Sequence, residues 1–96
     1  MANHVGELEV PVHASEKLAL VWREMQPQVL VRIGVMGMES LCLQIIRMRD
    51  AQQRIDAEGM IVADSKGSPI PHPAIAIERA AAAQVRSWLM KYGSTP

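Results

Sequence analysis

Three arginines in the middle of the chain, Arg47, Arg49 and Arg54, have the type and spacing that could bind an anion. A guanidinium group donates paired hydrogen bonds to phosphate or carboxylate oxygens, so arginines repeated along one helix suit the DNA backbone or an acidic protein surface. Lys17 and Arg23, nearer the N-terminus, form a competing basic patch. These side chains are therefore the candidates for contact with DNA phosphates or with the acidic surface of a protein partner, with the three arginines first.

The same region has a simpler interpretation as a solvated helix face. Asp50, Asp56 and Glu58 alternate with the arginines, and opposite charges four residues apart on a helix attract each other. On that interpretation Asp50 pairs with Arg54. Lys66 lies further along in a predicted turn, where it would contact either DNA or a protein partner.

The spacing of the remaining polar residues does not support metal binding or catalysis. His4, His13 and His72 lack a cysteine or carboxylate at metal-ligand spacing, so we expect surface or helix-capping histidines. The run from Ser65 to Ser68 lacks the order of a phosphate-binding P-loop, and Cys42 lies in an apolar run typical of a buried thiol. We expect no cofactor and no metal, and a small hydrolase has little support because no nucleophile and base can be placed together.

Composition indicates one helical domain. The 96 residues are 49% hydrophobic, with seven methionines and no phenylalanine, which favours helix packing over a β-sandwich. The formal net charge of zero excludes strong nucleic-acid binding through an overall positive field, so any DNA contact must be local or repeated. No stretch has the length of a membrane span and no secretion signal is recognisable, so we expect a soluble protein of the cytoplasm without membrane contact.

The first part of the chain is predicted to be an extended arm followed by a broken helix. Residues 1–13 hold glycine and proline around a short alternation of apolar residues, which predicts the arm. Ser15 is a suitable N-cap, and the helix should extend to about Ile33 with a break at Pro27. Its apolar face is expected to contain Leu18, Val21, Trp22, Met25, Val29 and Ile33.

Two longer helices are predicted after this break. Gly34 suits the end of the first helix, and Gly37 suits the N-cap of a second helix from Met38 to Glu58. A third helix should begin at Pro73 and end at Tyr92. Their inner faces are expected to contain Met38, Leu41, Ile45, Met48 and Ile55 in the second helix and Ala74, Ile77, Ala81, Val85, Trp88 and Tyr92 in the third.

The connector between the long helices is predicted to be a small β-hairpin. Residues 60–63 and 68–70 are apolar and flank the turn residues 64–67. The predicted fold is therefore all-α and mainly helical, an antiparallel helical hairpin preceded by a shorter kinked helix, with a β-hairpin-like connector.

The matched helices carry more apolar surface than they can bury in each other, which predicts self-association. Ile75, Ala82 and Leu89 lie beside the main apolar stripe of the third helix and are expected to contact another copy. Residues 14–96 are accordingly predicted to form a single helical oligomerisation domain.

The order of several motifs resembles the phage terminase small subunits of the P27 type. The run Leu-Val-Trp22-Arg-Glu-Met-Gln-Pro27 is followed by Gly34 and by a helix ending Ile55-Asp-Ala-Glu-Gly59-Met-Ile-Val. His72-Pro73-Ala and the closing Lys91-Tyr-Gly93-Ser-Thr-Pro96 complete the pattern. The resemblance covers about residues 14–96.

This resemblance implies a non-catalytic, often ring-shaped homo-oligomer that binds double-stranded DNA and delivers it to the ATP-driven large terminase subunit. Family members commonly continue into a basic tail beyond the closing motif, and many carry a separate N-terminal helix-turn-helix. Residues 1–14 cannot hold such a domain, so we expect weak DNA binding with little sequence choice, in a phage or a phage-derived gene transfer agent. The alternative is a small helical adaptor that binds one protein and no DNA.

Overall fold

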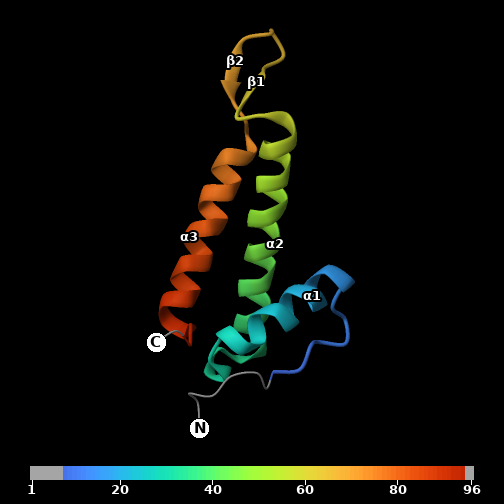
Figure 1. Cartoon of the computed structure of the whole chain (residues 1–96), viewed down its shortest axis with the longest axis vertical. Coiled ribbons are helices and arrows are strands. Elements are labelled where there is room, and N and C mark those ends of the chain that lie inside the picture. Colours follow the sequence, from blue (N-terminus) through green and yellow to red (C-terminus); the bar gives the residue numbers. More distant parts are fainter. Residues whose placement is uncertain (1–7, 95–96) are drawn as a thin grey trace.

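The computed structural model, which describes residues 8–94, is a long helical hairpin with a short helix packed at one end (Figure 1). Helices α2 (Gly34–Glu58) and α3 (Ala74–Tyr92) run antiparallel, and α1 (Glu16–Met25) packs on α2. Strands β1 (Ile61–Ala63) and β2 (Pro69–Pro71) lie at the opposite end from α1. The predicted fold class is confirmed.

The first helix begins and breaks for local reasons. The hydroxyl of Ser15 accepts a hydrogen bond from the Leu18 amide at 3.1 Å, which confirms the predicted cap. Helix α1 ends at Met25, because Pro27 takes the next turn into a 3₁₀ helix, Gln26–Gln28. Val29 is extended and forms an antiparallel bridge with Gly93. The segment is therefore broken into separate pieces rather than kinked.

Helix α2 begins earlier than the sequence indicated. A second 3₁₀ turn, Val31–Ile33, leads into it, and Gly34 takes φ 77° at the junction, a backbone conformation that favours glycine. Gly37 lies inside α2, so its predicted capping role is wrong. A Cβ at position 37 would lie 2.9 Å from Cγ1 of Ile33 and 3.4 Å from the Trp88 ring. The Ile33 side chain would therefore have to shift to admit a Cβ at position 37, whereas the distance to the Trp88 ring would be an ordinary van der Waals contact.

The main core lies where α1 crosses the base of the helical hairpin. Trp22, Met38, Leu41 and Cys42 are fully buried there. All six predicted residues of the first apolar face are buried, whereas Ile77 of the predicted α3 stripe is 44% exposed. A smaller cluster of Ala51, Ile55 and Ala74, with Ile75 packed against it, closes the far end of the hairpin.

The connector is a two-stranded antiparallel hairpin, as predicted. Val62 pairs with Ile70, and the Asp64 carboxylate accepts hydrogen bonds from the amides of Lys66 and Ser68 at 2.9 Å each. Gly67 takes φ 84° in this turn. Met60 and Ile61 are more than 60% exposed, so the connector presents apolar side chains at its base.

The described part of residues 1–13 is held against α1. The Leu8 carbonyl accepts hydrogen bonds from the Trp22 indole N–H, at 2.9 Å, and from the side-chain amide of Gln26. Leu8 and Val10 pack against the main core. The described part of the chain excludes residues 1–7 of the predicted arm, which include His4, and residues 95–96 of the closing motif.

The molecule is elongated, with principal extents of 57 × 28 × 17 Å. Its radius of gyration is 16.1 Å, whereas a compact chain of this length would have about 12 to 13 Å. The projecting half of the helical hairpin therefore has no third layer to cover it within residues 8–94. None of the helices in this range combines the length and the hydropathy that a membrane span requires.

Candidate nucleic-acid and partner interface

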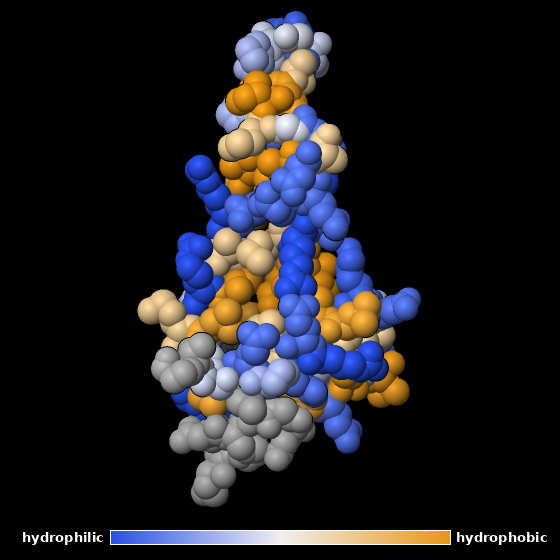
Figure 2. Space-filling model, viewed as in Figure 1, coloured by the Kyte–Doolittle hydropathy of each residue, from blue (hydrophilic) through white to orange (hydrophobic). Residues whose placement is uncertain are grey.

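An open groove follows one side of the helical hairpin between α2 and α3. It has a volume of about 600 Å³, and two of its lining residues, Leu43 and Ile77, are exposed apolar side chains. Figure 2 shows apolar surface along the middle of the molecule, flanked by hydrophilic side chains. The groove is lined by Leu43, Ile46, Arg47, Asp50, Ala51, Arg54, Ala74 and Ile77.

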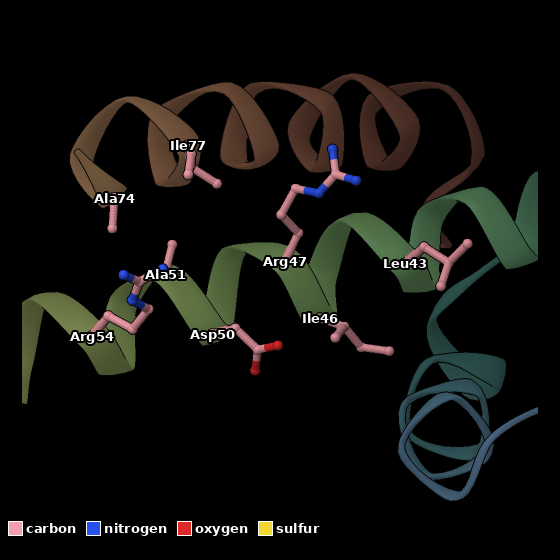
Figure 3. Close-up of a pocket in the computed structure, with 8 residues that line it drawn as sticks. All are labelled: Leu43, Ile46, Arg47, Asp50, Ala51, Arg54, Ala74 and Ile77. Atoms are coloured by element: carbon pink, nitrogen blue, oxygen red, sulfur yellow. The ribbon is translucent and has the colours of Figure 1, made fainter.

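Two of the predicted DNA-binding residues, Arg47 and Arg54, lie in this groove. Figure 3 shows Arg47 extending from α2 toward α3. No carboxylate of residues 8–94 lies within 4.0 Å of the Arg47 guanidinium, while Nε of Arg54 is 4.0 Å from Glu58 on the same helix. Both side chains are exposed, so the groove combines an apolar floor with positive charge available to a partner.

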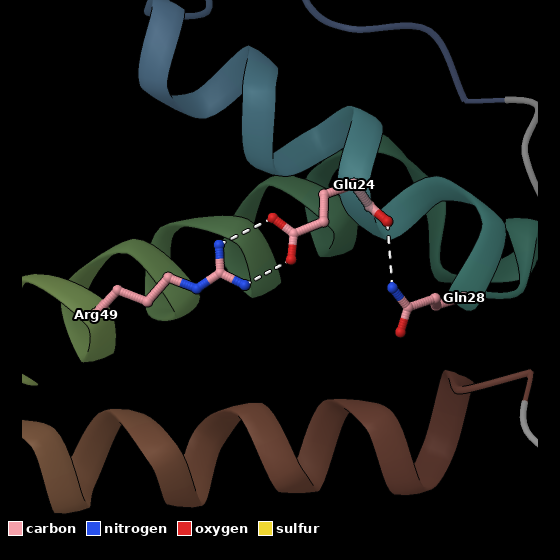
Figure 4. Close-up of polar contacts among 3 residues, drawn as sticks. All are labelled: Glu24, Gln28 and Arg49. Atoms are coloured by element: carbon pink, nitrogen blue, oxygen red, sulfur yellow. Dashed lines mark hydrogen bonds and ion pairs between the residues drawn. The ribbon is translucent and has the colours of Figure 1, made fainter.

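Arg49 and Lys17 are instead paired between helices. Arg49 donates two hydrogen bonds to the Glu24 carboxylate, at 2.9 and 2.6 Å, and joins α2 to α1 (Figure 4). Lys17 of α1 donates to Asp50 of α2 at 2.8 Å. The predicted pairing of Asp50 with Arg54 is therefore wrong, because a lysine from another helix reaches the carboxylate. These pairs partly neutralise two of the predicted DNA contacts.

The Glu24 to Arg49 pair gives a pH-dependent prediction. Hydrogen bonds from Arg49 lower the pKa of Glu24 below its ordinary value of 4.5. The pair therefore stabilises the fold above that value, and this contribution is lost as the pH falls through the lowered pKa. Because both side chains are nearly half exposed, we expect Glu24→Gln to reduce the free energy of unfolding at pH 7 by at most about 1 kcal/mol.

Urea unfolding of the wild type and Glu24→Gln at pH 7 and pH 3 measures this effect. The difference between the two proteins should shrink at pH 3. Glu16→Gln is a suitable control, because Glu16 is exposed on the same helix and has no ion pair within residues 8–94. A difference that stays constant between the two pH values would contradict the assignment.

The remaining basic candidates lie apart from the groove. Arg23 is exposed on α1, and Lys66 is exposed in the turn of the β-hairpin. The structure thus divides the predicted DNA-binding residues into a groove pair, a paired group at the α1 to α2 contact, and single charges at the two ends. Sequence spacing alone placed Arg47, Arg49 and Arg54 in one group.

The residues predicted to contact another copy are partly buried within the chain. Ile75 packs against the cluster of Ala51 and Ile55, and Leu89 packs against the main core. Ala82 lies between them on α3 and is also half-buried. Each side chain therefore retains some exposed surface along one flank of α3, and their role in assembly stays a prediction.

His72 joins the β-hairpin to both long helices. It is 3% exposed, its Nδ1 accepts the Ala74 amide proton at 2.9 Å, and its Nε2 lies 2.8 Å from a Glu58 oxygen. Since a backbone amide can only donate, Nδ1 carries no proton and Nε2 donates to Glu58. His72 is the capping residue that the sequence allowed, but its burial was not predicted. His13 is exposed beside Glu39.

Cys42 is buried, as predicted. Burial, with smaller contributions from the charges of Glu24 and Glu39, raises the pKa of its thiol to about 11. The thiol is therefore protonated at neutral pH, which is the unreactive form. Residues 8–94 contain no group of three or more histidine, cysteine or carboxylate side chains arranged to hold a metal ion.

One cluster could not be recognised from the sequence because its members are distant in the chain. Arg32 lies over the Tyr92 ring at 5.2 Å from its centroid, and Lys91 lies 5.5 Å from the same centroid. The Trp88 and Tyr92 ring centroids are 5.7 Å apart. The closing Lys-Tyr-Gly motif was the only sequence signal for this cluster.

The fold and its surface define a small α-helical protein built around a projecting helical hairpin with a basic, apolar groove. The family model described as phage terminase, small subunit, matches residues 17–96, which is most of the chain. The chain therefore belongs to the phage terminase small subunits, and its role lies in phage DNA packaging. The P27 type within this family stays a prediction. No curated protein and no solved structure matched the sequence.

Proposed function

We propose that copies of this chain assemble into a ring that holds double-stranded DNA for packaging. The observation that supports assembly is the uncovered half of the helical hairpin, along which Ile75, Ala82 and Leu89 keep exposed surface on one flank of α3. Apolar surface of this kind on an elongated 57 Å body is best covered by identical neighbours. The flank of α3 containing Ala82 is the proposed contact.

DNA binding is proposed to depend on Arg47 and Arg54 first. These are the two arginines of the predicted group that extend into the groove rather than across the α1 to α2 contact. A ring repeats each basic side chain once per subunit, and tethered copies raise the effective concentration for every further contact. A chain with no net charge can then retain DNA through many weak phosphate contacts.

The β-hairpin is proposed to contact the large terminase subunit. It projects from the end of the helices that is remote from α1, and its strands make their main contacts with each other. An isolated two-stranded hairpin is only marginally stable in water, so a partner surface would stabilise it. Lys66 at the turn and the apolar side chains at the base offer that partner both charge and apolar area.

The DNA proposal predicts a change in salt dependence. Arg47→Ala with Arg54→Ala should weaken duplex binding and lower the log–log salt slope by about 0.9 for each phosphate that is no longer neutralised. The matched control is Arg79→Ala with Arg86→Ala, which removes equal charge from exposed positions on α3. Because these residues lie three and four positions from Ala82, native mass spectrometry must show that the oligomer of this control is intact. Binding measured by fluorescence anisotropy over a range of salt concentrations tests this. An unchanged slope in the groove variant would remove these residues from the proposal.

Native mass spectrometry separates the ring from the alternative function, a helical adaptor for one protein. A ring-sized mass, together with stimulation of a large terminase ATPase, supports packaging. A dimer that binds one protein and no DNA would instead support the adaptor.

A further inference from the structure

The aromatic cluster at the end of α3 combines two exposed cations with two partly buried aromatic rings. Arg32 and Lys91 lie 5.2 and 5.5 Å from the centroid of the same Tyr92 ring. Trp88 adjoins that ring, with an interplanar angle of 31°. The cluster lies at the α1 end of the molecule, away from the β-hairpin (Figure 1).

Main-chain hydrogen bonds hold this cluster in place. The Leu30 amide donates to the Tyr92 carbonyl at 2.8 Å, and the Ser94 amide donates to the Gln28 carbonyl at 2.9 Å. The Arg32 guanidinium also donates to the Lys91 carbonyl at 3.0 Å. The end of α3 and the segment after α1 are thus fastened together, and the Arg32 guanidinium is held in position before any ligand arrives.

The two charges lack an internal counterion among residues 8–94. No carboxylate in this range lies within 4.0 Å of Arg32 or Lys91. The ring face offers each cation only a weak attraction at an exposed site, so each keeps its charge for an anion. A phosphate group fits both kinds of donor.

Trp88 adds a flat surface next to these charges. It lines a shallow pocket of about 280 Å³, together with Gln84, Ser87, Lys91 and Tyr92. Its ring also lies over Gly37, so the indole is supported by α2 and is only partly buried. Supported aromatic rings beside basic residues are the features by which proteins bind single-stranded nucleic acid, with bases stacked on the ring.

We propose that this cluster binds single-stranded or frayed DNA, with Arg32 and Lys91 on a phosphate and Trp88 against an unpaired base. A duplex presents phosphates but no free base face, so the aromatic part of the site selects the unpaired strand. The inference rests on the proposed DNA-binding function but concerns a different surface from the groove of Arg47 and Arg54.

The test measures binding of an oligothymidine and of a duplex of equal length to the full chain. Arg32→Gln with Lys91→Gln should weaken oligothymidine binding at least tenfold and lower its salt slope by roughly 0.7 for each phosphate that is no longer neutralised. Duplex binding should change much less. The matched control, Arg79→Gln with Arg86→Gln, removes the same charge from exposed positions of α3 and should leave oligothymidine binding unchanged.

Tryptophan fluorescence supplies a second readout. Trp22 is fully buried, so quenching by oligothymidine should come from Trp88 and disappear in Trp88→Phe. Native mass spectrometry of each variant verifies that assembly is intact. Equal loss of duplex and oligothymidine binding in the Arg32 and Lys91 variant, absence of quenching, or loss of oligomers in that variant would overturn the proposal.

The same experiment separates this inference from the proposed function. Duplex binding that depends on Arg47 and Arg54, with no binding of oligothymidine, would reject the aromatic site alone. Failure of the wild type to bind either DNA would reject both.

Discussion

Replacing Ala82 by glutamate is expected to convert the assembled protein into monomers. Ala82 is half-buried on the flank of α3, midway in sequence between Ile75 and Leu89, which lie on the same side at seven-residue spacing. A carboxylate covered by a neighbouring subunit would lose its hydration, at a cost of several kcal/mol, and pairing with Arg86 four residues along α3 would return only part of that cost. Native mass spectrometry and light scattering should show loss of the oligomer.

The control for this variant is Ala83→Glu, which adds the same charge one residue further along α3. Ala83 is exposed, so a glutamate can remain solvated there unless the subunit interface includes the face of α3 that contains Ala83. Circular dichroism should show a helical protein in both cases. Oligomers that persist in Ala82→Glu but disappear in Ala83→Glu would show that the interface lies on the face of α3 that contains Ala83. A monomeric wild type at high concentration would refute assembly.

Truncating Trp22 to alanine should have the largest effect on stability. Its indole is fully buried at the contact between α1 and α2, and removal of such a ring leaves a cavity that costs about 3 to 5 kcal/mol. That decrease is a large share of the roughly 5 to 15 kcal/mol that stabilises a typical domain. Urea unfolding followed by circular dichroism should show a much lower midpoint.

Trp22→Phe separates packing from hydrogen bonding at this position. Phenylalanine retains an aromatic ring but lacks the N–H that donates to the Leu8 carbonyl. That carbonyl keeps Gln26 as a donor, so removing the indole N–H leaves no orphaned group. We expect Trp22→Phe to be clearly less destabilising than Trp22→Ala; equal destabilisation would show that the indole N–H, rather than its volume, stabilises this end of the molecule.

Local patterns in the sequence predicted those features that depend on neighbouring residues. All six residues predicted for the first apolar face are buried, and for Leu18, Val21, Trp22 and Met25 the reason is helical spacing along α1. Val29 and Ile33 are buried although they lie beyond the end of that helix. The Ser15 cap and the turn containing Gly67 also follow from local backbone requirements. Helix α3 ends at Tyr92, as predicted.

Features that depend on distant parts of the chain were not predictable in the same way. Gly37 resembles a cap in sequence, but it lies inside α2, with the Ile33 side chain packed close to it and the Trp88 ring of α3 beside it. Asp50 has an arginine four residues away, yet Lys17 of α1 reaches it. The aromatic cluster joins Arg32 to Tyr92 across the helical hairpin. Spacing along one helix carries no information about which other helix lies beside it.

The position of His72 has a mechanical consequence for the projecting tip. This one imidazole holds the carboxylate of Glu58 and the first amide of α3, while its own main-chain amide donates to the Met60 carbonyl at 2.8 Å. His72 therefore connects the start of the β-hairpin with the end of α2 and the start of α3. If the β-hairpin contacts the large terminase subunit as proposed, a force applied there would be transmitted along α2 and α3 toward the α1 end of the molecule.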